Sequence, residues 1–179
     1  MPPPLPSRVT LALAATALAG LYTACDLSPL PSPGPEPAKT GAATAAMRER
    51  LIEWVPAPDG DVAAVAQAEL ERAQKDGRAL LVYVGATWCE PCSRFHEAAE
   101  RGEIGPDLPP LRILEFDLDR DADRLAAAGY RSRLIPLFVV PGPDGRASDE
   151  RVEGGIKGPG AAANLVSRLR KLLSRSKGS

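Results

Sequence analysis

Residues 84–95 have the sequence VGATWCEPCSRF, in which Cys89 and Cys92 are separated by two residues. The preceding run, ALLVYVGA at 79–86, carries no charge, which is typical of a strand buried on both faces of a parallel sheet. The run CEPCSRFHEAAERG at 89–102 predicts a helix with a proline in its first turn and a glycine at its end. The two cysteines are therefore expected at the junction of a buried strand and a helix.

Strands and helices alternate along the rest of the predicted domain. An amphipathic helix over 59–77, capped by Asp59 or Asp61, precedes the cysteine strand, and the turn signal PGPDGR at 141–146 predicts an antiparallel hairpin. The pattern predicts an α/β fold with a central mixed sheet flanked by helices, in which the last two strands form that hairpin. The remaining expected elements are a short edge strand or helical turn at 48–55, strands at 111–119, 134–140 and 147–155, and helices at 121–130 and 158–179.

The first residues resemble an export signal. Residues 9–21 form an uncharged run that is too short to span a bilayer and has the length of the apolar part of a secretory signal. The following residues resemble a bacterial lipoprotein signal, in which the cysteine, here Cys25, is lipidated and becomes the first mature residue. Tyr22 stands where that signal has an aliphatic residue. An ordinary cleaved signal peptide and an uncleaved membrane anchor are the alternatives, and all three place the domain on the periplasmic side of a membrane.

A proline-rich segment separates this signal from the domain. Prolines at positions 29, 31, 33, 35 and 37 exclude helix and sheet and predict a stiff spacer. We therefore divide the chain into a signal peptide at 1–24, a linker at 25–46 and a folded domain at 47–179. The formal net charge of −1 gives no support for nucleic-acid binding, which requires a basic surface.

Four roles are open to the cysteine pair: a metal site, a haem attachment, a structural disulfide and a redox pair. Structural zinc takes four thiolate or imidazole ligands, and His96 is the only histidine in the chain. Haem attachment requires a histidine directly after the second cysteine, where Ser93 stands. A disulfide that closes so small a loop stabilises a fold little. Redox chemistry, with no metal and no cofactor, is therefore the favoured interpretation.

This chemistry requires the predicted placement of the two cysteines. At a helix amino terminus, unpaired N–H groups and the helix dipole stabilise the thiolate of Cys89. That thiolate attacks a disulfide as the nucleophile, and Cys92, one helical turn later, resolves the mixed disulfide. Pro91 fixes the turn between them.

Three segments of the 47–179 domain give it a resemblance to the thioredoxin-fold thiol–disulfide oxidoreductases. WCEPC matches the family's W-C-x-x-C, RLIPLFVV resembles its cis-proline strand, and VEGGIKGPGAAANLVSRL resembles its last strand and closing helix, so that the likeness covers about residues 60–174. The resemblance implies that Pro136 is a cis-proline beside the cysteines and that the backbone of Ile135 binds an extended substrate. It also implies that Trp88 lies beside Cys89 as an aromatic lid and, with Pro91, borders the substrate.

The segment ATWCEPC is similar to that of membrane-tethered, extracytoplasmic thioredoxins that reduce apocytochrome c and other exported proteins. The connection RGEIGPDLPP at 101–110 lacks the insert usual in those proteins, which argues against the cytochrome assignment but not against the redox chemistry. The resemblance implies protein dithiols or disulfides as substrates and an upstream electron donor in the membrane. With Cys25 lipidated, the protein itself would be a membrane-anchored lipoprotein.

Some positions depart from the family pattern. Tyr83 stands where thioredoxins have a buried aspartate, and Glu115 stands where the neighbouring strand usually has a lysine. Glu115 is either a replacement acid and base for Cys92 or a surface carboxylate paired with an arginine. Glu90 opposes thiolate formation at Cys89, which favours a reductase or exchanger over an oxidase.

Two alternative functions remain open from the sequence. The first is a thiol oxidant or isomerase on the same fold. The second is a non-enzymatic copper-binding chaperone that uses Cys89, Cys92 and His96 as ligands.

Overall fold

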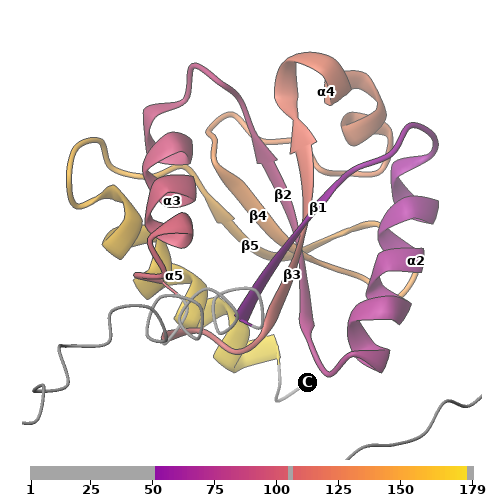
Figure 1. Ribbon diagram of the computed structural model, residues 1–179. Helices are drawn as coiled ribbons and strands as arrows, with labels where there is room; N and C mark the ends of the chain where they lie inside the picture. Colours follow the sequence, from indigo (N-terminus) through magenta and orange to yellow (C-terminus); the bar gives the residue numbers. More distant parts are fainter. Residues whose placement is uncertain (1–50, 105–106, 177–179) are drawn as a thin grey trace, which may run out of the picture. The chain divides into compact units, whose positions relative to one another are not determined.

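The computed structural model describes residues 51–104 and 107–176 and shows a five-stranded mixed sheet in the order β1-β3-β2-β4-β5 (Figure 1). Strands β1, β3 and β2 are parallel, whereas β4 is antiparallel to β2 and forms an antiparallel hairpin with β5. The predicted fold class is therefore confirmed, and β1 is an edge strand. The strands are β1 Ile52–Pro56, β2 Ala79–Gly85, β3 Leu111–Asp117, β4 Leu137–Pro141 and β5 Ala147–Glu153.

Helices cover both faces of the sheet. Helices α3 and α5 lie on one face and α2 and α4 on the other (Figure 1). None of the helices within the described ranges combines the length and apolarity needed to cross a bilayer. The predicted signal peptide, Cys25 and the proline-rich linker lie outside the described residues and stay predictions. The helices are α2 Val62–Lys75, α3 Glu90–Glu100, α4 Leu118–Ala127 and α5 Ala161–Ser176.

Alternation along β2 and β3 sets which side chains face α3. On β2, Leu81 and Tyr83 belong to the core between the sheet and α3 and α5. On β3, Ile113 belongs to the same core, and Glu115, two residues later, faces the same side of the sheet. Because Tyr83 is the register partner of Glu115, the two side chains leave the sheet next to each other.

Aromatic rings fill the core beneath α3. Phe95, which is fully buried, lies with its ring centroid 5.0 Å from that of Phe138 on β4, and Tyr83 lies 5.0 Å from the same ring. Trp54 on the edge strand β1 also belongs to this cluster, and its ring centroid lies 5.6 Å from that of Tyr83 in an edge-to-face arrangement. Such contacts add about 0.5–1.5 kcal/mol each beyond the area they bury. They fix the rotation of α3, and hence the direction in which its cysteine end points.

Helix α2 shows one departure from its apolar pattern. Asp61 provides the predicted cap, since its side chain accepts a hydrogen bond of 2.8 Å from the N–H of Ala64. Glu69, however, is buried on the face that packs against the sheet. It forms ion pairs with Arg72 and, at 3.5 Å, with Arg112 of β3, and these pairs compensate its buried charge.

The turn from β3 into α4 is held by two carboxylates. Asp117 caps α4 by accepting hydrogen bonds from the N–H groups of Asp119 and Arg120. Asp121 is buried and accepts from the Asp117 N–H at 3.0 Å and from the guanidinium groups of Arg120 and Arg124. Burial of Asp121 opposes its ionisation, but these hydrogen bonds outweigh that effect and hold its pKa below the ordinary value.

Replacing Asp121 by asparagine is expected to lower the free energy of unfolding by about 1–3 kcal/mol at neutral pH, because two guanidinium groups lose an anionic acceptor. A carboxyl group whose folded pKa is lowered stabilises the fold above its unfolded pKa, and loses that contribution as pH falls through the folded pKa. Urea unfolding of both proteins at pH 7 and near about pH 3 measures this. The difference should shrink at the lower pH. The control variant Asp123→Asn changes an exposed residue of the same helix, and its free energy of unfolding should match that of the unaltered protein at both pH values. A difference that is the same at the two pH values would contradict the assignment.

Candidate active site

Cys89 and Cys92 form a disulfide at the amino end of α3. Cys89 is the N-cap of the helix, and the backbone N–H of Cys92 lies 3.3 Å from its sulfur as a hydrogen-bond donor. Pro91 lies in the first turn, where its missing N–H costs nothing. A sulfur in this position faces the positive end of the helix dipole, so that the Cys89 thiolate is stabilised once the disulfide is reduced.

The two cysteines border different cavities. Both are nearly inaccessible, with 4% of Cys89 and 2% of Cys92 exposed. Cys89 lines an open groove of about 660 Å³, whereas Cys92 lines a second cavity of about 480 Å³ on the other side of the disulfide. The pair therefore stands between two pockets, the groove beside Cys89 and the cavity beside Cys92, and both open to the surface.

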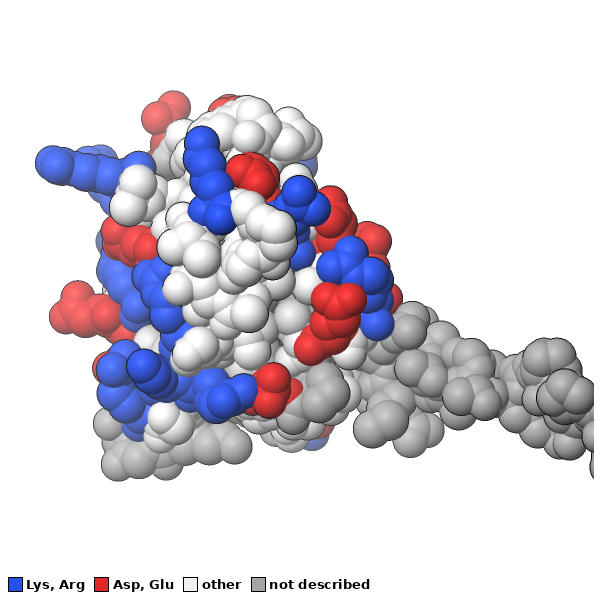
Figure 2. Space-filling view, turned by 90° about the vertical axis from the view of Figure 1, so that its left-hand side faces the viewer, with Lys and Arg blue, Asp and Glu red and all other residues white. Residues whose placement is uncertain are grey.

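The groove beside Cys89 gathers exposed apolar side chains. Trp88, Leu134 and Ile156 are 65%, 61% and 52% exposed, and within the described ranges they are the large hydrophobic residues that are exposed. All three line this groove. Figure 2 shows the side of the molecule that carries α3 and the segment leading into α5, where an uncharged surface is bordered by charged side chains of both signs. Exposed apolar surface of this kind is typical of a binding site for another protein.

The segment before β4 forms the wall of the groove opposite α3. The Ile135–Pro136 peptide bond is cis, and Ile135 and Leu134 line the groove together with Pro91. The carbonyl of Pro136 accepts a hydrogen bond of 2.8 Å from the N–H of Gly154, which ties this segment to the end of β5. Among the described residues, no hydrogen bond uses the backbone of Ile135, so its polar groups are open to a ligand.

Trp88 is held in place from α4. Its indole Nε1 donates a hydrogen bond of 2.9 Å to Oδ2 of Asp119. The side chain therefore stands beside Cys89 as an oriented, exposed ring. The contact joins residues far apart in the chain, and no local sequence pattern indicates it.

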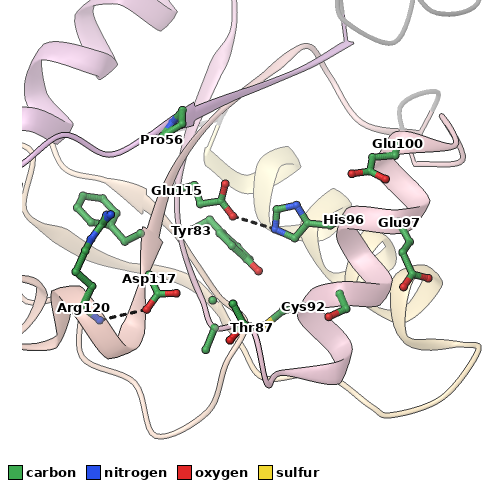
Figure 3. A pocket seen from close by; sticks show the side chains of 14 residues that line it. Pro56, Tyr83, Thr87, Cys92, His96, Glu97, Glu100, Glu115, Asp117 and Arg120 are labelled. Atoms are coloured by element: carbon green, nitrogen blue, oxygen red, sulfur yellow. Dashed lines mark hydrogen bonds and ion pairs between the residues drawn. The ribbon is translucent and has the colours of Figure 1, made fainter.

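Ionisable side chains line the cavity beside Cys92 (Figure 3). Nε2 of His96 lies 3.0 Å from Oε1 of Glu115, and both side chains are about one third exposed. The ring of Trp54 stacks on the imidazole with centroids 4.1 Å apart, which fixes the ring plane. Of the two sequence-based alternatives for Glu115, the arginine-paired surface carboxylate is wrong in its partner, since Glu115 faces the cavity and pairs with His96.

Tyr83 takes the position beside the cavity at which the family resemblance places an aspartate. Burial, together with the negative charges of Glu115 and Asp117, raises the pKa of its phenol well above the ordinary value. Tyr83 therefore keeps its proton at neutral pH and its hydroxyl group is able to donate a hydrogen bond. Gly85 makes room for the ring, because a Cβ atom there would lie 2.3 Å from the Tyr83 hydroxyl oxygen.

The copper-chaperone alternative gains no support from this geometry. His96 is directed to Glu115 and Trp54, and no cluster of three or more histidine, cysteine, aspartate or glutamate side chains suited to a metal ion is found in the described part of the chain.

The sequence pointed to both cysteines, to Glu115, and to Trp88, Pro91, Ile135 and Pro136 on the substrate side. It did not point to Leu134 and Ile156 in the groove or to Trp54 against His96. The structure brings Glu115 into the cavity of Cys92, and Trp88 and Ile135 into the groove of Cys89. His96 follows Cys92 by four residues and so shares its helix face, a signal that was present in the sequence. The stacking of Trp54 depends on the position of β1, which no local pattern shows.

Comparison with known proteins gives fold-level matches only. No protein-family model and no curated protein matches the sequence. Among solved structures, the chain is similar to a single-residue mutant of a thioredoxin from Halobacterium salinarum NRC-1, at 21% identity over 64% of this chain and 88% of that chain, with a TM-score of 0.39. It is also similar to a wild-type thioredoxin h from poplar, at 23% identity over 69% of this chain and 96% of that chain, with a TM-score of 0.41.

The assignment of the fold rests on the structure itself. A mixed sheet in the order β1-β3-β2-β4-β5, helices on both faces and a cysteine pair at the amino end of the helix after β2 are the features of the thioredoxin fold. A disulfide at that position, one of whose cysteines borders a surface groove, has the geometry for thiol–disulfide exchange.

Proposed function

We propose that this protein is an exported reductase or exchanger of protein disulfides that works through Cys89. The observation that carries the proposal is the groove, in which Cys89 and the three large exposed hydrophobic side chains of the described chain lie together. A small-molecule thiol would gain nothing from so large an exposed apolar surface. A protein segment would cover it and bring its own disulfide to the sulfur of Cys89.

The reaction runs in two exchange steps. The Cys89 thiolate attacks one sulfur of the substrate disulfide, and the other substrate sulfur leaves as a thiolate and takes up a proton. Cys92 then attacks Cys89, which forms the Cys89–Cys92 disulfide and releases the second substrate sulfur. The substrate gains two electrons and two protons, which the enzyme dithiol loses. An electron-donating dithiol, supplied by a membrane protein, reduces the pair again.

The groove fits an extended polypeptide. The backbone N–H and C=O of Ile135 are open, and they can pair with the backbone of a segment that lies along the groove. Trp88 and Ile156 then cover the substrate side chains on the two sides of the cysteine. Recognition through backbone groups and apolar surface tolerates many sequences, which suits an enzyme with several protein substrates.

Glu90 supports a reductant rather than a strong oxidant. Its carboxylate lies between the cysteines in sequence and accepts a hydrogen bond of 3.1 Å from the N–H of Gly158. A fixed negative charge next to Cys89 disfavours the thiolate, whereas strong oxidants depend on a highly stabilised thiolate. The oxidant or isomerase alternative therefore has the weaker support.

The export signal and the linker give the proposed setting. Residues 9–21 resemble a secretory signal, Cys25 is the proposed site of lipidation, and the proline-rich spacer would hold the domain away from the membrane surface. We place the domain on the periplasmic side, next to exported proteins that carry disulfides and to the proposed membrane donor.

Trapping of mixed disulfides tests the enzymatic part of the proposal. The full chain with Cys25→Ser contains only Cys89 and Cys92, so any mixed disulfide involves the site. Adding Cys92→Ser removes the resolving thiol, and we expect adducts with periplasmic proteins that disappear on treatment with dithiothreitol. The matched Cys89→Ser variant should trap few or none. Equal trapping by the two variants, or none by either, would refute the assignment of Cys89 as the nucleophile.

Labelling with radioactive palmitate tests the membrane anchor. The full chain expressed in a Gram-negative host should incorporate the label and partition with membranes, and Cys25→Ser should lose both properties because the acylated sulfur is gone. Cys89→Ser serves as the control and should still be labelled. Label that persists in Cys25→Ser would rule out lipidation at this cysteine.

A further inference from the structure

The cavity beside Cys92 bears on how the Cys92 thiol loses its proton during the exchange reaction. The inference rests on the proposed function. Once Cys89 is joined to substrate, the remaining thiol, that of Cys92, must lose its proton before it can attack. The side chain is 2% exposed and faces the cavity of about 480 Å³ rather than the groove. A positioned proton acceptor in this cavity would speed that step, because burial of the thiol disfavours its charged form.

Ionisable groups face this cavity from four elements (Figure 3). Most of them are already committed or unsuited to the task. The groups are His96, Glu97 and Glu100 on α3, Tyr83 on β2, Glu115 and Asp117 on β3, and Arg120 on α4.

The contacts of these groups leave one candidate. Asp117 caps α4 through two backbone N–H groups, and Arg120 pairs with the buried Asp121. Glu97 lies 3.5 Å from Arg94 and 3.8 Å from a second arginine, at position 101. Glu100, the last residue of α3, is exposed and lies two helical turns beyond Cys92. Tyr83 already carries a proton that burial makes hard to remove, so it cannot serve as the acceptor.

His96 and Glu115 remain, and their geometry suits proton transfer. His96 follows Cys92 by one helical turn and so lies on the same face of α3. Its Nε2 is 3.0 Å from Oε1 of Glu115, and the stacked ring of Trp54 holds the imidazole in that orientation. A carboxylate hydrogen-bonded to an imidazole fixes the tautomer of the ring and stabilises an added proton.

We propose that the His96–Glu115 pair accepts the proton of Cys92 during resolution of the mixed disulfide and returns it when the enzyme disulfide is reduced. The Cys92 S–H bond breaks, its proton passes to the pair, and the electron pair left on sulfur forms the Cys89–Cys92 bond. The bond between Cys89 and the substrate sulfur breaks at the same time, and that sulfur leaves as a thiolate. The cavity is wide enough for water, which occupies about 30 Å³ per molecule in the liquid, to carry the proton across.

Tyr83 has a supporting part in this arrangement. Its ring packs edge-on against the imidazole of His96, with centroids 5.4 Å apart, and its hydroxyl group lines the same cavity as Cys92. A phenol that keeps its proton donates a hydrogen bond, which orders water and stabilises a thiolate. Tyr83 is therefore a positioning residue, and the proton is held by His96 and Glu115.

Reaction with Ellman's reagent separates the two sulfur steps. Reduced full chain with Cys25→Ser first releases one thionitrobenzoate as Cys89 attacks, and releases a second as Cys92 attacks the resulting mixed disulfide. We expect Glu115→Gln and His96→Asn to slow the second release about tenfold or more near pH 7. The deficit should shrink as pH rises, because hydroxide then removes the thiol proton without help from the pair.

The controls make the outcome decisive. The first release should stay within about twofold of the unaltered rate, which shows that each variant is folded and that Cys89 reacts. Glu100→Gln removes a carboxylate from the same cavity and helix without touching the pair, and should keep the unaltered pH profile. The proposal would be overturned if the rate of the second release in Glu115→Gln had the pH profile of the unaltered protein. It would also be overturned if that rate fell by the same factor at every pH. Loss of the first release in the parent protein would instead refute the proposed function.

Discussion

The amino end of α3 is anchored at the carboxyl end of a strand that is buried on both faces. Strand β2 is the central strand of the sheet, flanked by β3 and β4, so its end cannot shift without disturbing both neighbours. The N–H of Cys89 donates to the carbonyl of Ala86, which fixes the N-cap of the helix to the residue that follows the strand. Packing of Phe95 in the core then sets the rotation of α3. The direction of each sulfur follows from these constraints.

This anchoring divides the work between the two cysteines. Cys89 borders the groove, where apolar side chains and the open backbone of Ile135 are suited to a polypeptide. Cys92 borders the second cavity, where the paired His96 and Glu115 are suited to holding a proton. A substrate bound in the groove would therefore leave the proton route open. Sulfur exchange and proton transfer take place on opposite sides of one bond.

The parts predicted from the sequence are those with a local signal. The cysteine spacing, the uncharged run of β2, the Asp61 cap and the hairpin turn each depend on a few neighbouring residues, and the structure shows all of them. Glu115 was also identified, because it stands where the strand next to the cysteine strand usually has a lysine in the resembled family.

Other features depend on how separate elements pack. The pairing of Glu115 with His96 follows from the rotation of α3 over β3, and the stacking of Trp54 follows from the placement of β1 at the sheet edge. Burial of Glu69 inside an otherwise apolar helix face depends on Arg112, which lies beneath it on β3. Local patterns hold no information on such contacts, because each joins residues far apart in the chain.

The redox potential of the Cys89–Cys92 couple tests most directly the claim that this protein is a reductant of protein disulfides. It is measured by equilibrating the full chain with Cys25→Ser against glutathione or dithiothreitol buffers and quantifying the free thiols by alkylation. We predict a single reversible two-electron transition at about −270 mV, in the range of reducing thioredoxins. A potential near about −120 mV, typical of strong oxidants, or the absence of a reversible transition, would contradict it.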